Sequence, residues 1–282
     1  MIDIDNLTFY YHRRSDTVIR DLSMHLGNGG IYGLLGCNGV GKTTLLNLMA
    51  GALFPVSGSV TFNGENVDKR LPETMQSLMV VPDEINLPAM KLDRWVSINA
   101  PFYPEFSHEL MAEAIEMFQV PVSTPLNRMS MGERKKVYIA FALAANTRLL
   151  LMDEPTNGLD IPAKAQFRRL LAMTDSSERL IIISSHQVRD LDGMLDHIII
   201  MADGGIVLNE SIDSIAERLD FRTLTYDDTC HGKILYSQPV IGGQAVITPH
   251  DPSLPLTKVD IEMLFNYSVT DSTSLTFFTR ND

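Results

Sequence analysis

Apolar and polar residues alternate along the first part of the chain, and this alternation predicts β-strands. It covers Ile2–Phe9 and residues 21–26, while residues 31–35 form a short apolar run of strand length. A further strand is predicted at residues 59–62, just before an Asn-Gly turn. The first part of the chain is therefore expected to be rich in β-structure.

A helical insertion is predicted at about residues 84–130, where several prolines break the chain. Ser107 has the residue type of a helix N-cap, and an acidic residue follows in the first turn. The four apolar residues at positions i, i+3, i+4 and i+7 after it are Met111, Ala114, Ile115 and Phe118. This spacing predicts a helix with one apolar face.

Strands and helices are predicted to alternate in the rest of the first 218 residues. Residues 149–152 and 180–184 are continuous apolar runs of strand length. Residues 42–50, 134–145 and 163–173 have helical composition. Such alternation is typical of an α/β fold with a mostly parallel sheet that helices cover on both faces.

The pattern changes after about residue 218, where glycines and prolines punctuate short β-like runs. Two of these runs are residues 233–236 and 244–247, and residues 259–265 predict a short helix. We therefore expect a main domain at 1–218 and a small α+β appendage at 219–282. The appendage is expected to stabilise a dimer, to dock a partner, or to be an inert cap.

Composition and charge narrow the function classes. The 282 residues include 23 Lys and Arg and 35 Asp and Glu, a formal net charge of −12, which argues against nucleic acid as the main partner. The only cysteines, Cys37 and Cys230, form no disulfide framework and favour a reducing compartment. No apolar run approaches the ~20 residues that span a bilayer, so a membrane role requires a partner subunit.

Residues 36–43, GCNGVGKT, match the phosphate-binding pattern G-x-x-x-x-G-K-[ST] between a predicted strand and a predicted helix. Glycines allow successive backbone N–H groups to surround an anion, and the following helix adds its positive dipole end. Lys42 is expected to reach the β- and γ-phosphates of ATP, and the Thr43 hydroxyl to bind Mg²⁺. The residues expected to bind the nucleotide here are Gly36, Asn38, Gly39, Gly41, Lys42, Thr43 and Thr44.

A second acidic motif follows the apolar run 149–152. Asp153 is placed to hold Mg²⁺ through water, and the adjacent Glu154 can polarise an attacking water as general base. The longer segment LLLMDEPTNGLD, which ends at Asp160, resembles the Walker B strand and D-loop of ABC ATPases. A pair of solvated loop acids is the simpler reading, and this longer match argues against it.

The resemblance covers about residues 1–215 and implies fold and activity. The implied fold is a P-loop NTPase of the ABC ATPase type, with an N-terminal antiparallel β subdomain and a mostly parallel core sheet. The implied activity is ATP hydrolysis, with Asp153 as the magnesium-linked carboxylate, Glu154 as the catalytic base and Lys42 as a further catalytic residue. Asp160 is then the D-loop acid that communicates across a dimer.

Residues 129–133, MSMGE, resemble the LSGGQ signature of the same family. Ser130 and Gly132 are kept, whereas Met131 and Glu133 replace the usual Gly and Gln. In the family this segment contacts the γ-phosphate held by the opposite protomer, so Ser130 and Gly132 are implied nucleotide contacts across the dimer.

Three further residues stand at family positions, each with a simpler alternative. His186 resembles the switch histidine near the γ-phosphate, or is a loop histidine at a strand end. Asp83 stands where the family has the Q-loop Gln, and is either a contact of Mg²⁺ and its waters or a solvated acid. Tyr11 stands at the adenine-stacking position, with Tyr10 as its rival and a buried strand tyrosine as the alternative for both.

These features together predict the ATP-hydrolysing subunit of a membrane transporter. It is expected to form a homodimer or cassette heterodimer and to lie in the cytoplasm, at the inner face of the plasma membrane through an integral membrane permease. The segment FYPEF at 102–106, the altered signature and the short appendage resemble bacterial ABC-2-type exporter ATPases. The alternatives are a soluble ABC ATPase in a non-transport role such as cofactor assembly, and a regulatory nucleotide-binding module.

Overall fold

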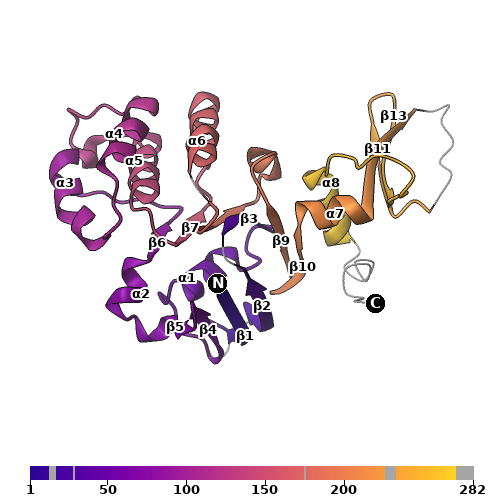
Figure 1. Cartoon of the computed structure of the whole chain (residues 1–282), viewed down its shortest axis with the longest axis horizontal. Coiled ribbons are helices and arrows are strands. Elements are labelled where there is room, and N and C mark those ends of the chain that lie inside the picture. The colour runs from indigo at the N-terminus through magenta and orange to yellow at the C-terminus, as the bar shows by residue number, and fades with distance from the viewer. Residues whose placement is uncertain (13–16, 28, 175, 226–232, 271–282) are drawn as a thin grey trace.

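The computed structural model contains three β-sheets with helices around them (Figure 1). It describes residues 1–12, 17–27, 29–174, 176–225 and 233–270, so Cys230 lies outside the described residues. Within these ranges the longest helix has 14 residues, and no helix is both long and apolar enough to cross a bilayer.

The first sheet is antiparallel where β1 meets its neighbours β2 and β4, as expected. Its strands, in the order β2-β1-β4-β5, are β1 (Ile2–Phe9), β2 (Ile19–Leu26), β4 (Ser57–Phe62) and β5 (Glu65–Asn66). The buried positions of β1 change from even to odd numbers, from Ile2 and Ile4 to Leu7 and Phe9. The register shifts between Ile4 and Leu7, and Asn6 there has φ 46°. This bulge keeps all four side chains on the buried face.

The core sheet has six strands in the order β10-β9-β3-β8-β7-β6. They are β3 (Gly30–Leu35), β6 (Leu78–Val81), β7 (Leu149–Asp153), β8 (Leu180–Ser185), β9 (His197–Ala202) and β10 (Gly205–Ser211). Only the β9–β10 pair is antiparallel, so the expectation of a mostly parallel sheet is confirmed.

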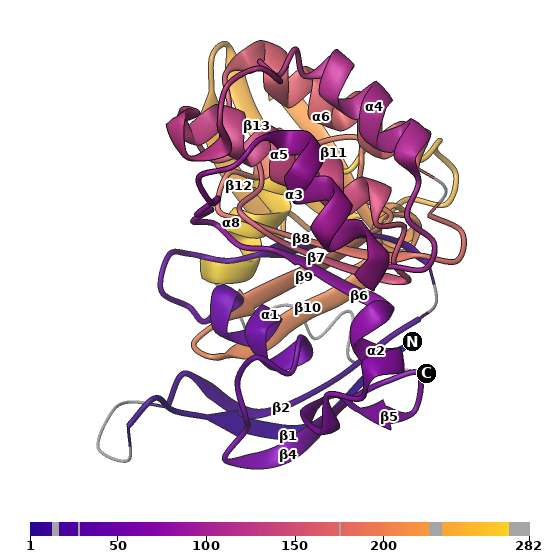
Figure 2. The same ribbon diagram turned by 90° about the vertical axis from the view of Figure 1, so that its left-hand side faces the viewer.

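Helices cover both faces of the core sheet, as Figure 2 shows. The α-helices are α1 (Lys42–Met49), α2 (Pro72–Gln76), α3 (Leu92–Asn99), α4 (His108–Met117), α5 (Met131–Ala144), α6 (Ile161–Met173), α7 (Ile212–Arg218) and α8 (Ile261–Thr270). The 3₁₀ helices are η1 (Val67–Lys69), η2 (Ala100–Phe102), η3 (Leu126–Arg128) and η4 (Val188–Leu191). Along β7, Leu149 and Leu151 join the apolar cluster that contains α1 and the first sheet, whereas Leu150 and Met152 join the cluster that contains α3 to α6. Because β7 is buried on both faces, its sequence is a continuous apolar run rather than an alternating one.

The helical region predicted at about residues 84–130 contains α3, η2, α4 and η3, and α5 begins directly after it. The Ser107 side chain accepts a hydrogen bond from the Leu110 N–H at 3.1 Å, which confirms it as the N-cap of α4. The four residues predicted to share one face, Met111, Ala114, Ile115 and Phe118, are all buried.

The third sheet comes next in the chain. In Figure 1 it lies at the right, on the opposite side of the picture from α3 and α4. Its order is β11-β13-β12, with β11 (Leu219–Thr225), β12 (Tyr236–Val240) and β13 (Gly243–Pro249). The strand predicted at 233–236 is wrong in its bounds, because β12 begins at Tyr236 and ends at Val240. The strand includes Pro239, which has no backbone N–H. As an edge strand paired with β13 alone, β12 tolerates a residue without an N–H.

The last helix is also displaced from its prediction at 259–265. The Asp260 side chain accepts a hydrogen bond from the Met263 N–H at 2.9 Å, so α8 begins after Asp260 and then runs to Thr270. The sequence pattern placed the start two residues too early because Val259 is apolar and buried although it precedes the helix.

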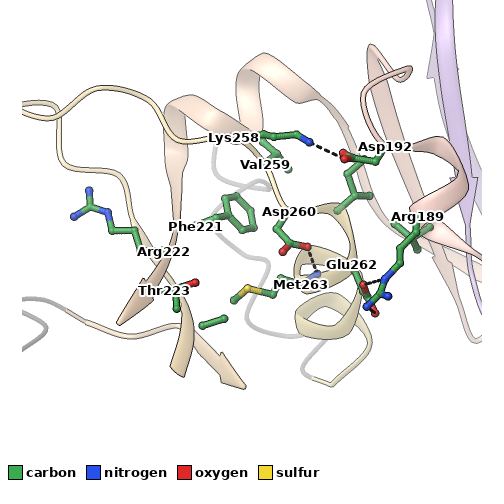
Figure 3. A pocket seen from close by; sticks show the side chains of 13 residues that line it. Arg189, Asp192, Phe221, Arg222, Thr223, Lys258, Val259, Asp260, Glu262 and Met263 are labelled. Atoms are coloured by element: carbon green, nitrogen blue, oxygen red, sulfur yellow. Dashed lines mark hydrogen bonds and ion pairs between the residues drawn. The ribbon is translucent and has the colours of Figure 1, made fainter. Parts of the chain in front are cut away.

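The third sheet and α8 meet η4 at a cavity of about 520 Å³ (Figure 3). Two ion pairs cross it, Arg189 Nε to Glu262 Oε2 and Lys258 Nζ to Asp192 Oδ2, both at 2.6 Å. Side chains of α8 and β13 belong to the same apolar cluster as the helical region. The third sheet, which begins at residue 219, therefore shares an apolar core with the preceding part of the chain.

Candidate functional site

Four neighbouring parallel strands, β3, β8, β7 and β6, end at the same edge of the core sheet. The loop 36–41 follows β3, and Asp153 is the last residue of β7. His186 directly follows β8, and Asp83 lies two residues beyond β6. Ligands of open α/β sheets bind at the carboxyl ends of the strands, where this fold gathers segments far apart in sequence.

A cavity of about 530 Å³ lies at this edge, within the usual size range of small-ligand sites. Its lining residues are Tyr11, Val18, Asn38, Gly39, Gly41, Lys42, Thr43, Thr44, Asp83, Glu154, Asn157 and His186. Ten of these twelve are sequence-predicted site residues. Val18 and Asn157 are not, and only Asn157 had a signal, because it belongs to the D-loop motif.

The loop 36–41 closes around the side chain of Lys42, which is 6% exposed. Its ammonium donates hydrogen bonds to the Gly36 carbonyl at 2.8 Å and the Cys37 carbonyl at 3.2 Å. Gly36 does not line the cavity; a Cβ there would lie 2.7 Å from Val40 Cγ1, so it shapes the loop instead. Gly41 has φ 112°, which favours glycine at the residue before α1. The N-terminus of α1 thus opens onto the cavity.

The two residues predicted to serve Mg²⁺ contact one another. Thr43 Oγ1 donates to Asp153 Oδ2 at 2.6 Å, and Ser184 Oγ donates to Asp153 Oδ1 at 2.5 Å. Among the described residues no group of three or more His, Cys, Asp or Glu side chains forms a metal site. Mg²⁺ in nucleotide sites uses one or two carboxylates together with phosphate oxygens, so this hydroxyl and carboxylate fit it. Sequence reasoning missed Ser184.

Glu154 and His186 form a pair beside Lys42. Glu154 Oε1 lies 2.9 Å from His186 Nδ1 and 3.8 Å from Lys42 Nζ, and its side chain is 12% exposed. The Glu154 backbone has φ 46°, and its N–H lies 3.1 Å from Ser184 Oγ and 3.2 Å from the Ser184 carbonyl. A carboxylate in this position can accept a proton from water held in the cavity.

Asp83 lines the cavity, but it is engaged by a residue that the sequence reasoning missed. Lys135 Nζ donates to Asp83 Oδ1 at 3.1 Å and to the Glu154 backbone carbonyl at 2.8 Å. Lys135 is 2% exposed, and it lies on the buried face of α5, four residues before Ile139. A lysine at an apolar helix position was the available signal. Asp83 is therefore an ion-pair partner rather than a free solvated acid.

Tyr11, and not its rival Tyr10, is the tyrosine that lines the cavity. Its hydroxyl lies 2.9 Å from Thr44 Oγ1, and its ring makes an edge contact with Phe9 at 5.0 Å between centroids. The side chain is 54% exposed, so an aromatic surface remains open to a ligand.

Three predicted nucleotide contacts, Ser130, Gly132 and Asp160, do not line this cavity. Ser130 is the N-cap of α5 and forms a capping box with Glu133. The Ser130 N–H donates to Glu133 Oε2 at 2.7 Å, and the Glu133 N–H donates to Ser130 Oγ at 3.3 Å. Hydrogen bonding to the Ser130 backbone N–H, and secondly to the Ser130 side chain, lowers the pKa of the Glu133 carboxyl group. Asp160 caps α6 by accepting a hydrogen bond from the Ala163 N–H at 2.9 Å.

Comparison with known proteins gives one consistent result. A family model described as ABC transporter matches residues 19–157. The bacitracin transport ATP-binding protein BcrA of Bacillus licheniformis is 31% identical, over 72% of this chain and 68% of BcrA. The ABC transporter ATP-binding protein NatA of Bacillus subtilis is 30% identical, over 74% and 87%. The lantibiotic transport ATP-binding protein SrtF of Streptococcus pyogenes is 27% identical, over 76% and 92%.

Solved structures agree in fold. A structure described as the ATP-binding subunit of an ABC transporter has a TM-score of 0.68, with 21% identity over 76% of this chain and 91% of that one. A dimeric ATP-binding cassette bound to ADP and phosphate has a TM-score of 0.65, with 20% identity over 75% and 98%.

Proposed function

This chain belongs to the family of ABC transporter ATP-binding proteins, and on that premise we propose that it hydrolyses ATP in the cavity at residues 36–44 and drives a membrane permease. Family membership makes it an ATPase and the ATP-binding subunit of a transporter.

The observation that carries the residue roles is the Glu154–His186 contact beside Lys42. Lys42, already inside the phosphate loop, stabilises the negative charge that develops on the transferred phosphate. Glu154 accepts a proton from the attacking water, and His186 holds the Glu154 carboxylate toward the cavity.

Asp153 and Thr43 are proposed to hold Mg²⁺, which when bound neutralises phosphate charge. Ser184 keeps Asp153 in place because its hydroxyl binds the second carboxylate oxygen. Asp83 is held by Lys135 and faces the same cavity, where it is available to the waters of the ion.

A second copy of the cassette is proposed to complete the site. Ser130 and Asp160 are exposed and lie outside the cavity of their own chain, which is what residues serving a neighbour require. A solved structure of the same fold is a dimer bound to ADP and phosphate. We infer a head-to-tail dimer in which Ser130 and Gly132 of each copy cover the nucleotide of the other. Closure on ATP and opening after hydrolysis would move the permease.

Export is the proposed direction, because SrtF and BcrA are named for transport of a lantibiotic and of bacitracin. The cassette would lie at the inner face of the membrane through the permease. The alternatives are a soluble ATPase with a non-transport role and a regulatory module that binds nucleotide without hydrolysing it. The two tests below distinguish them from a transport ATPase.

Exchange of Glu154 for Gln tests the catalytic role. Glu154→Gln keeps the shape and loses the base, so ATP turnover is expected to fall by about 10²- to 10⁴-fold while nucleotide binding persists. Light scattering with MgATP is then expected to give the mass of a dimer. Glu113→Gln, an exposed glutamate on α4, is the matched control and should turn over ATP at the wild-type rate. Wild-type turnover in Glu154→Gln would remove the base assignment, and no turnover in the wild type would favour the regulatory role.

Affinity purification from detergent-solubilised native membranes tests the permease. A multi-span membrane protein in stoichiometric amount is the expected result. Soluble partners alone, with ATPase activity intact, would support the non-transport role.

A further inference from the structure

Lys135 is a buried cation that none of the proposed catalytic roles uses. It lies on α5, five residues after Ser130, and is 2% exposed. A buried ammonium is costly unless its hydrogen-bonding groups are satisfied. Its two recorded partners, Asp83 Oδ1 and the Glu154 carbonyl, both belong to residues that line the ATP cavity.

The Glu154 main chain depends on such support. Its φ of 46° is a left-handed conformation that is unfavourable for a non-glycine residue and persists where the surroundings impose it. Ser184 holds the N–H side of the residue, as described above. On the carbonyl side, Lys135 Nζ donates at 2.8 Å and the Asn157 N–H at 3.1 Å. The Glu154 side chain branches from this main chain, so the main-chain conformation and the His186 contact together set the direction of the carboxylate.

We propose that Lys135 is a positioning residue of ATP hydrolysis, which fixes the Glu154 backbone through its carbonyl while Asp83 holds the Lys135 ammonium in place. The inference rests on the proposed function, because it assigns Lys135 to the base that acts there. Lys135 does not line the cavity, so its removal should disturb the reaction more than the binding of ATP.

Two substitutions remove the contact with Glu154. Lys135→Met keeps an unbranched side chain, one atom shorter than lysine, and loses the donor. Lys135→Gln is equally short and uncharged, so its amide cannot reach both partners. Both are expected to fold, because an apolar or neutral side chain replaces a buried charge and Asp83, whose side chain is 43% exposed, can be hydrated. In each, kcat is expected to fall by about 10- to 100-fold while the KM for ATP changes by less than about threefold.

Three companion measurements complete the experiment. Lys135→Arg keeps a charged donor and should recover kcat to within about fivefold of the wild type. Lys136→Met, the same exchange one residue along α5, is the matched control and should leave kcat unchanged. The thermal midpoint of each variant reports folding separately from the reaction.

The outcomes separate this inference from the proposed function. Wild-type kcat in Lys135→Met and Lys135→Gln would overturn the positioning role while the proposed function stood. A fall in the thermal midpoint together with a loss of ATP binding in both would also overturn it, because the role would be structural. If Glu154→Gln turned over ATP at the wild-type rate, the base assignment in the proposed function, on which this inference rests, would itself have failed.

Discussion

At the residue scale, two acidic residues that depart from the family motifs, Glu133 and Asp83, have local physical reasons. Glu133 replaces the usual Gln and is the N3 residue of a capping box with Ser130, where a carboxylate also faces the positive end of the helix dipole. Asp83 replaces the Q-loop Gln and pairs with Lys135. Each acidic side chain therefore has a nearby donor or cation that accounts for its charge.

Tyr11 is expected to be the residue that stacks on the adenine base. Tyr11→Ala should weaken nucleotide affinity by about 5- to 100-fold, the usual effect of removing one base-stacking ring. Tyr10→Ala should leave affinity unchanged, because Tyr10 does not line the cavity. Titration with a fluorescent ATP analogue measures both, and equal effects of the two substitutions would remove the distinction between them.

At the element scale, strand ends and helix starts place the chemistry. The four parallel strands end side by side, so their following residues converge, and α1 begins inside the phosphate loop. The start of α5 matters in the same way, because Ser130 is both its cap and a proposed contact to the partner copy. A change at Ser130 is therefore expected to affect stability and turnover together.

The contribution of the α5 capping box to stability can be measured apart from its effect on turnover, because it depends on pH. Ser130→Ala should lower the free energy of unfolding by about 1 kcal/mol at neutral pH. Hydrogen bonds from Ser130 depress the pKa of Glu133, so the stabilisation by its carboxylate is present above the ordinary glutamate pKa. It is lost as the pH falls through the lower pKa of the folded state.

Chemical denaturation of Glu133→Ala and wild type across pH is the measurement. Their difference in unfolding free energy should be constant from pH 7 to about pH 5 and shrink below about pH 4. A difference that grew at low pH would contradict the depressed pKa.

At the scale of the whole molecule, one apolar cluster runs from the helical region through the core sheet to the third sheet. Leu264 on α8 and Ile247 on β13 are fully buried in it. The ion pairs at the same junction contribute less, because the side chain of Arg189 is 83% exposed. We therefore expect the described residues of the third sheet and α8 to stabilise the ATPase core chiefly through apolar packing.

Removal of the Leu264 side chain should destabilise the protein by about 2–5 kcal/mol, the range for a buried leucine replaced by alanine. Leu254→Ala is the matched control, because Leu254 is 40% exposed in the same region and should cost far less. Thermal unfolding of the full chain measures both. A small effect of Leu264→Ala would mean that the third sheet folds apart from the core.

The contiguous motifs and the elements with a clear local pattern were predictable from the sequence, because their physical signals are local. No element was predicted at β6, β9, β10 or α7. Periodicity predicted both kinds of strand, and the loop 36–43 and the pair Asp153-Glu154 were recognisable from neighbouring residues. It did not predict the exact bounds of β12 and α8, where an edge strand and a capping side chain decide the ends. Nor did it exclude Tyr10 as the rival of Tyr11, which only the lining of the cavity distinguishes.

The tertiary structure alone decided which distant residues meet. Ser184 contacts Asp153 from 31 positions away, and Lys135 contacts Asp83 from 52 positions away. No local pattern encodes such contacts, because they depend on the order of strands in the sheet and on the packing of α5 beside it. The reason is geometric: parallel strands bring their carboxyl ends together whatever the length of chain between them.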